Sequence, residues 1–264
     1  MAASKCLRSS IPIWNQATTS KRFIELYDYD GPQKSPTVLY VPGFQGAGHG
    51  SKSQELIKHC QKSGRRYICY DPEGIAESKV EDIMTLEFKH WFEDAETAIK
   101  ASNSKEIILI GSSMGGWISL KMANLYPDII KGLLLIAPAV NFLRQKYDLW
   151  YQHASPEIRK EQDEGKATVM NSSYGTVPVR KDFVEKSREL EFDLSSKLEI
   201  KCPVKIVHGV QDDTVPHLQS LKVMEMISST DVDLIYQKSG DHVMQAQNSI
   251  DLIKRNLDEL LLKV

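Results

Sequence analysis

A serine lies between two glycines at residues 111–115, where Gly-Ser-Ser-Met-Gly fits the pattern G-x-S-x-G with Ser113 at its centre. The pattern follows an apolar run and precedes a stretch with helical spacing. In that context it predicts a nucleophile elbow, a strained turn that lifts one hydroxyl above the edge of a sheet. Glycines suit the flanking positions because a β-carbon there would collide with a neighbouring strand or helix. Ser113 is therefore the predicted nucleophile, and Ser112 is interpreted as a small residue that fits the turn.

A serine hydroxyl reacts at neutral pH only when a general base takes its proton, and that base needs an orienting carboxylate. Three histidines follow Ser113 outside a long insertion. His242 lies in a polar turn between the last predicted strand and the final helix, and we expect it to be the base. His208 ends a strand and is interpreted as structural, whereas His217 follows a proline and is expected at the surface.

Two neighbouring aspartates, Asp212 and Asp213, follow the strand that ends at His208. We expect Asp212 to be the acid and Asp213 to cap a turn or face solvent. Nucleophile, acid and base then occur in the chain order of α/β-hydrolases.

The developing oxyanion requires two N–H donors. The loop at residues 42–46, Pro-Gly-Phe-Gln-Gly, follows an early strand, and we expect the backbone N–H of Phe44 to be one donor and that of Met114 the other. A plain glycine-rich turn is the alternative interpretation of this loop.

These side chains need a scaffold, and short apolar runs alternate with helical spacing along the chain. Strands are predicted at residues 37–41, 66–70, 106–110, 132–137, 204–208 and 232–237. Apolar residues repeat at three and four positions within residues 88–99 and 250–261, which predicts two amphipathic helices. The alternation predicts an α/β fold with a mostly parallel central sheet and helices on both faces.

Residues 141–199 contain no strand candidate, and a structureless loop of that length is abnormal in a compact domain. We expect a helical lid insertion there. Ser155, followed by proline, predicts the start of one helix that stops near Gly165, and a second is expected at about residues 181–190. Several side chains are able to line an apolar space or to pack the lid on the sheet: Phe142, Leu143, Tyr147, Trp150 and Tyr151.

The composition bounds the class of protein. The chain has 264 residues, of which 41% are hydrophobic, and this is enough to form one large domain. Its formal net charge of −2 gives no basic surface for nucleic acid. No apolar run approaches the roughly 20 residues that a transmembrane helix needs, so we expect a soluble protein. The four scattered cysteines are expected to be free thiols, with no metal site.

The N-terminal residues 1–22 carry serines and basic residues but no acid. The segment resembles a short mitochondrial presequence, and a basic disordered tail is the alternative. The hydrolase domain is expected to span residues 23–264, in a mitochondrial protein or, alternatively, a cytoplasmic one.

The motifs in this order resemble the α/β-hydrolase superfamily from about residue 23 to the C-terminus. Residues 111–117, 200–213 and 229–242 resemble its mitochondrial branch, which comprises palmitoyl-protein thioesterases and mycophenolic acid acyl-glucuronide esterases. The resemblance implies cleavage of acyl groups without metal or organic cofactor. It also gives the roles of nucleophile, acid and base to Ser113, Asp212 and His242. In one departure, Ala76 stands where the family loop usually has its second glycine.

The sequence therefore predicts a serine hydrolase that acts on acyl thioesters or esters. Its substrates would be an S-acylated protein, or a small acyl ester or glucuronide whose carboxylate could meet Arg144, Arg159 or Arg180. The alternatives are other chemistry on the same fold, such as general carboxylester or C–C bond hydrolysis, and a non-catalytic binding module. The sequence does not predict the oligomeric state.

Overall fold

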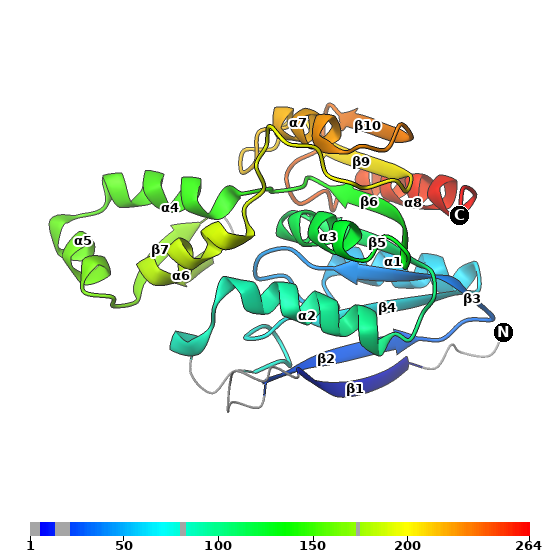
Figure 1. Cartoon of the computed structure of the whole chain (residues 1–264), viewed down its shortest axis with the longest axis horizontal. Helices are drawn as coiled ribbons and strands as arrows, with labels where there is room; N and C mark the ends of the chain where they lie inside the picture. The colour runs from blue at the N-terminus through cyan, green and yellow to red at the C-terminus, as the bar shows by residue number, and fades with distance from the viewer. Residues whose placement is uncertain (1–5, 14–21, 80–82, 173–174) are drawn as a thin grey trace.

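The computed structural model describes residues 6–13, 22–79, 83–172 and 175–264. Within them, eight strands form one sheet in the order β1-β2-β4-β3-β5-β6-β9-β10 (Figure 1). The strands are β1 (Cys6–Ile13), β2 (Arg22–Tyr29), β3 (Gln33–Val41), β4 (Arg65–Asp71), β5 (Ile107–Ser112), β6 (Ile130–Ile136), β9 (Val204–Gly209) and β10 (Val232–Gln237). The six strands predicted from the sequence are confirmed, and they are the six parallel ones.

Helices cover both faces of the sheet, as the alternation predicted. They are α1 (Ser51–Lys62), α2 (Phe88–Ala101), α3 (Met114–Leu125), α7 (Leu218–Met226) and α8 (Gln247–Leu261), with a short 3₁₀ helix, η1 (Ile83–Thr85), before α2. All six residues of β5 are buried, and alternate side chains enter two hydrophobic clusters. One cluster packs under α2 and α3 and the other under α1 and α8, which lie on opposite sides of the sheet in Figure 1. No helix in the described part of the chain is long and apolar enough to cross a membrane.

The sequence analysis missed the first two strands. β1 lies within the segment that was expected to be a basic tail or presequence, yet it pairs antiparallel with β2 along its whole length and forms an edge of the sheet. The expectation of a disordered tail is therefore wrong for residues 6–13. Five successive residues of β1 are exposed, so the strand has little of the apolar alternation that marks a half-buried strand.

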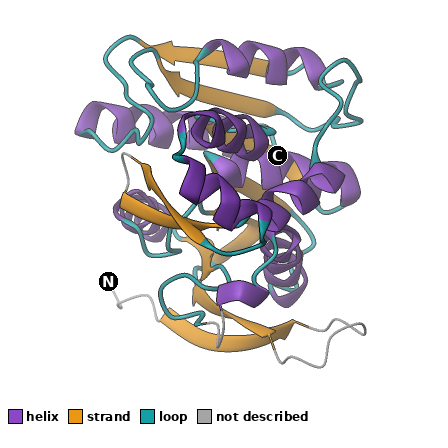
Figure 2. Cartoon of the chain, turned by 90° about the vertical axis from the view of Figure 1, so that its left-hand side faces the viewer, coloured by secondary structure: helices purple, strands orange, loops and turns teal. Residues whose placement is uncertain are grey.

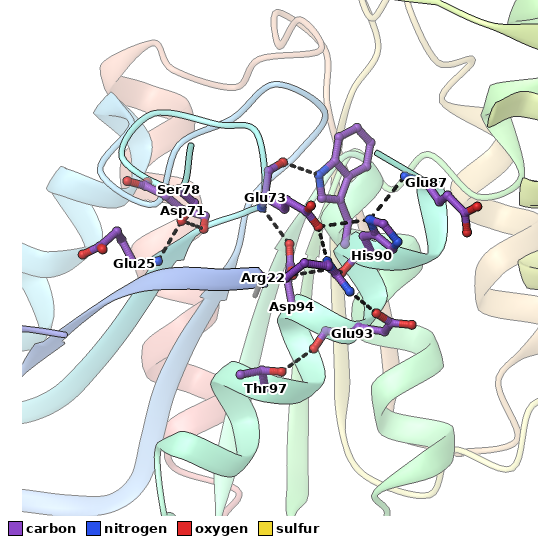
Figure 3. Close-up of polar contacts among 11 residues, drawn as sticks. Arg22, Glu25, Asp71, Glu73, Ser78, Glu87, His90, Glu93, Asp94 and Thr97 are labelled. Atoms are coloured by element: carbon purple, nitrogen blue, oxygen red, sulfur yellow. Dashed lines mark hydrogen bonds and ion pairs between the residues drawn. The ribbon is translucent and has the colours of Figure 1, made fainter. Parts of the chain in front are cut away.

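A cluster of buried charged side chains connects β2 to α2 and to the loop that follows β4 through ion pairs (Figure 3). The Arg22 guanidinium on β2 contacts the carboxylates of Glu73, Glu93 and Asp94. Nδ1 of His90 lies 3.0 Å from the same Glu73 carboxylate, and Oδ2 of Asp94 accepts a 2.7 Å hydrogen bond from the Glu73 backbone. The first residue of β2 thus joins three segments that are far apart in sequence.

A lid projects from the sheet at one end of the molecule, at the left of Figure 1 and toward the viewer in Figure 2. It consists of α4 (Phe142–His153), α5 (Pro156–Asp163), β7 (Thr168–Ser172), β8 (Gly175–Val179), α6 (Lys181–Lys186) and the 3₁₀ helix η2 (Ser187–Leu190). The helix after Ser155 is confirmed, including its side-chain cap to Ile158 N, and α6 with η2 matches the second expected helix. The insertion is mainly helical as expected, but it also contains β7 and β8, an antiparallel hairpin that the sequence analysis did not predict.

Candidate active site

Ser113 occupies the turn between β5 and α3 with φ 54° and ψ −119°. A positive φ is costly for a residue with a β-carbon, and it persists only where the surroundings enforce it. A β-carbon on Gly111 would lie 2.4 Å from the Gly115 oxygen, and one on Gly115 would lie 2.1 Å from the Val41 oxygen. The reason expected for the flanking glycines, a collision with a neighbouring strand or helix, is confirmed.

Ser113, His242 and Asp212 form a continuous chain of hydrogen bonds. Nε2 of His242 lies 2.9 Å from Oγ of Ser113, and Nδ1 lies 2.6 Å from Oδ2 of Asp212. The serine is thereby oriented to donate its proton to Nε2, while Nδ1–H donates to the carboxylate. The structure brings together the three residues that were chosen from the sequence.

The three side chains come from loops at one edge of the sheet. β5, β9 and β10 end just before Ser113, Asp212 and His242 respectively. Parallel pairing of β5 with β6, β6 with β9 and β9 with β10 sets their carboxyl ends side by side. Ligands bind at this edge of open α/β sheets.

The Asp212 carboxylate is buried and accepts four hydrogen bonds. Oδ1 accepts from the backbone N–H of Thr214 at 2.8 Å and of Val215 at 2.7 Å, and Oδ2 accepts from His242 and from Nε2 of His208 at 2.8 Å. Burial alone would raise the pKa of Asp212, but the hydrogen bonds from the two histidines and Val215 hold it well below its usual range. The carboxylate is therefore ionised and fixed in place.

His208, which the sequence analysis interpreted as structural, lies in contact with the predicted acid. Its buried ring lies between Asp212 and Ser220, whose Oγ is 2.7 Å from Nδ1. With Ser220 donating to Nδ1, Nε2–H of His208 donates to Oδ2 of Asp212, the same oxygen that accepts from His242. Its placement four residues before Asp212 at a strand end was the only signal in the sequence.

The backbone N–H groups of Phe44 and Met114 lie in the two segments beside Ser113, and neither makes a backbone hydrogen bond within the described residues. Met114 begins α3, where N–H groups lack partners and the positive end of the helix dipole lies. The loop with Phe44 lies against the elbow, since a β-carbon on Gly43 would be 3.2 Å from Cβ of Ser113. This arrangement is compatible with the predicted oxyanion hole.

A cavity of about 830 Å³ reaches Ser113 and His242 from beneath the lid. Of the five lid residues expected to line an apolar space, Phe142, Leu143 and Trp150 do so. Tyr147 and Tyr151 do not line this cavity, and they stack on each other with ring centroids 5.8 Å apart. The lid side of the cavity is mostly apolar, with Leu149, Ile158 and Val169 adding to it, and it also includes the polar residues Lys146, His153 and Ser155.

The other candidates lie outside the hydrogen-bonded chain. Asp213 is exposed at the edge of the cavity, as expected, and accepts from Thr214 Oγ1 at 3.1 Å. His217 precedes α7, where it is partly exposed and its backbone oxygen accepts from Tyr236.

None of the three arginines considered for a substrate carboxylate is among the described residues that line the cavity. Arg144 and Arg180 pair with acidic side chains of the lid, and Arg159 lies elsewhere on α5. The amino groups at the cavity belong to Lys52 and Lys146. The sequence analysis missed Lys52, although a basic residue in the first turn of a helix is an unusual feature.

The comparisons with known proteins agree on the family of this chain. The family described as serine aminopeptidase, S33 matches residues 32–247, a range that includes Ser113, Asp212 and His242. The human protein named palmitoyl-protein thioesterase ABHD10, mitochondrial, is 30% identical over 234 residues, which is 88% of this chain and 74% of the human one. The mouse protein of the same name is 31% identical over 235 residues, covering 88% of this chain and 77% of its own.

The solved structure of alpha/beta hydrolase domain-containing protein 10 from mouse is similar to the whole chain. It has a TM-score of 0.82 and 27% identity, covering 97% of this chain and 99% of that chain. A putative hydrolase from Agrobacterium vitis has a TM-score of 0.86 at 24% identity, covering 97% of this chain and 99% of its own, which is a likeness of fold.

Proposed function

We propose that this chain, which belongs to the serine aminopeptidase S33 family of α/β-hydrolases, is a serine hydrolase that forms an acyl-enzyme on Ser113. The observation that carries the proposal is the unbroken hydrogen-bonded path from Ser113 through His242 to Asp212 at the floor of a cavity. A binding module would need neither a nucleophile nor its base.

The chemistry follows from the geometry. Nε2 of His242 takes the Ser113 proton as Oγ attacks the acyl carbon, and the oxyanion faces the N–H groups of Phe44 and Met114. His242 then gives the proton to the departing thiol or alcohol. A water molecule loses a proton to His242, attacks the acyl-serine and releases the acid with Ser113 restored. Asp212 stays ionised throughout and stabilises the imidazolium.

We propose acyl thioesters and esters as the substrate class, with S-acylated proteins first and acyl glucuronides second. Two observations support this choice. The relatives described above are named palmitoyl-protein thioesterases, and the lid side of the cavity is mostly apolar, which suits a long acyl chain. Parallel assays of a palmitoylated peptide and an acyl glucuronide, at equal enzyme concentration, separate the two substrates.

A mitochondrial location is part of the proposal, because the same relatives are named mitochondrial proteins. Imaging of the full chain with a C-terminal tag tests it, and a diffuse cytoplasmic signal would contradict it.

A fluorophosphonate probe tests the nucleophile. We expect labelling of the natural chain and of Ser112→Ala, and none of Ser113→Ala, whose turnover should fall by about four to six orders of magnitude. Ser112 is the matched control because it is the adjacent hydroxyl in the same turn. Labelling that survives in Ser113→Ala would refute the assignment.

A further inference from the structure

Lys52 lies in the first turn of α1, outside the lid, and it lines the same cavity as Ser113. Its side chain is buried, with the residue only 5% exposed, and its ammonium donates a 2.7 Å hydrogen bond to Oγ of Ser112, the residue before the nucleophile. The mechanism described above does not use this amino group. A buried cation next to a nucleophile therefore needs its own explanation.

No carboxylate within the described residues forms an ion pair with Lys52, and Ser112 is the hydrogen-bond acceptor that the structure gives it. The charge of Asp241, an exposed residue, reaches it only as a weaker opposing influence on a pKa that burial lowers to about 8. Tyr40 also lies beside Ser112, but burial raises the pKa of its phenol to about 12, so it supplies no negative charge at neutral pH. Burying an unpaired charge is costly unless an anion compensates it.

The start of α1 adds further donors at the same place. Gly50, the N-cap residue, has no side chain to accept from the first turn, and that turn contains no acidic residue. Gly50 and Ser51 line the cavity together with Lys52. The free N–H groups and the positive end of the helix dipole therefore favour an anion where the lysine also favours one.

The two sides of the cavity differ in chemistry. The lid contributes mainly apolar side chains such as Leu149 and Trp150, together with the exposed Lys146, whereas the start of α1 contributes the buried ammonium of Lys52, the Ser51 residue and backbone. Figure 1 shows α1 behind the sheet and α4 in the lid, so these linings come from separate parts of the molecule. If the lid holds the acyl chain, the group that leaves Ser113 lies on the α1 side.

We propose that Lys52 and the N-terminus of α1 form an anion subsite that binds a carboxylate on the leaving group of the substrate. This inference rests on the proposed function and narrows its substrate class to acyl compounds whose thiol or alcohol portion is anionic. Lys52 is then a specificity-determining residue, and the substrate carboxylate supplies the counter-charge that the protein itself does not.

A matched pair of thioesters tests the subsite. S-decanoyl mercaptopropionate and its neutral S-decanoyl mercaptopropionamide have the same acyl group and nearly the same leaving-group size. We expect the natural chain to prefer the carboxylate by about tenfold or more in kcat/KM, through a lower KM. Lys52→Met should abolish that preference. Lys146→Met should keep it, because Lys146 is an exposed lysine on α4 at the same cavity.

The preference is the ratio of the two kcat/KM values measured with one enzyme preparation. A general loss of activity in Lys52→Met lowers both values equally and leaves the ratio unchanged. If the natural chain hydrolyses both thioesters equally well, the subsite is refuted and the proposed function stands. If it hydrolyses neither, the proposed function fails, and titration of Ser113→Ala with the same pair decides the subsite without turnover. Tighter binding of the carboxylate supports it, and equal affinity refutes it.

Discussion

The Asp212 carboxylate is held by two imidazoles and two backbone N–H groups, whereas the Lys52 ammonium has one hydroxyl. Burial penalises the charged form of both groups. For Asp212 the hydrogen bonds outweigh that penalty, and its lowered pKa means that the charged form is favoured. For Lys52 the single hydrogen bond does not outweigh the penalty of burial, and its lowered pKa means that the charged form is disfavoured. The acid is therefore stable as placed, while Lys52 destabilises the fold at neutral pH.

The cost of Lys52 predicts a pH-dependent effect of Lys52→Met on stability. The pKa of Lys52 is about 8 in the folded chain against an ordinary 10.5, so between these values the unfolded chain binds more protons and stability rises with pH. Methionine has no such charge. The gain in free energy of unfolding from Lys52→Met should therefore be about 2 kcal/mol larger at pH 7 than at pH 10.

Urea unfolding of both proteins at the two pH values measures this difference. At each pH, the free energy of unfolding of the natural chain is subtracted from that of the variant, which cancels the contribution of the other titrating groups. Lys146→Met serves as the control, because an exposed lysine should give nearly the same effect at both pH values. An equally large effect of Lys52→Met at pH 7 and pH 10 would contradict the buried charge.

The sequence predicted Ser113, Asp212 and His242 because each lies in a turn directly after an apolar strand, and parallel strands bring such turns to one edge. His208 and Lys52 could not be predicted in the same way. Their roles depend on the direction in which one side chain points from a strand end or a helix start. Packing fixes those directions, and the spacing of residue types does not record them.

At the scale of elements, the apolar run decided what the sequence could predict. All six parallel strands appear as such runs, including β10, an edge strand without a fully buried residue that matches its predicted bounds of 232–237. β1 is an edge strand with an exposed face, and the β7–β8 hairpin lies in a lid rather than in the main sheet. Neither β1 nor the hairpin carries a continuous apolar run or a clear apolar alternation, so the pattern alone did not indicate these strands.

The loop after β4 offers an element-scale test. Ala76 adopts φ 47° and is exposed. A β-carbon in the left-handed region costs about 1–2 kcal/mol, and the greater backbone freedom of unfolded glycine offsets about 0.5–1 kcal/mol of the gain. Ala76→Gly should therefore raise the stability by up to about 1 kcal/mol, or about 2–4 °C in Tm.

Thermal unfolding measures the change in Tm. Ala101→Gly is the matched control, since Ala101 is also exposed but lies in the last turn of α2, where glycine lowers helix propensity. The two substitutions should act in opposite directions. A loss of stability in both would show that Ala76 is not held in the left-handed region.

At the scale of the whole molecule, the fold depends on charges as well as on its two hydrophobic clusters. The Arg22 guanidinium joins β2, the loop after β4 and α2 in the buried group of Figure 3. Complete burial raises the pKa of Asp94. Burial opposes ionisation of Glu73 too, but its contacts with His90 and Arg22 lower its pKa, so Glu73 is the ionised partner of the arginine.

Removing the arginine should expose this dependence. Arg22→Met leaves the ionised carboxylate of Glu73 buried without the arginine that pairs with it, which should lower the free energy of unfolding by about 3–5 kcal/mol near neutral pH. The pKa of Glu73, which Arg22 helps to lower, should rise in the variant, so protonation neutralises this carboxylate as the pH falls, and the loss should be smaller at pH 5 than at pH 8. Urea unfolding at the two pH values measures this loss of stability.

Arg22→Lys keeps the charge without the planar fork of the guanidinium, so it should lower the stability by less. Arg8→Met removes an arginine of β1 whose side chain is half exposed, and its smaller loss should not depend on pH in this way. A loss from Arg22→Met that is the same at both pH values would mean that Arg22 acts by packing alone, and that the N-terminal strands are held by their backbone pairing rather than by this charge.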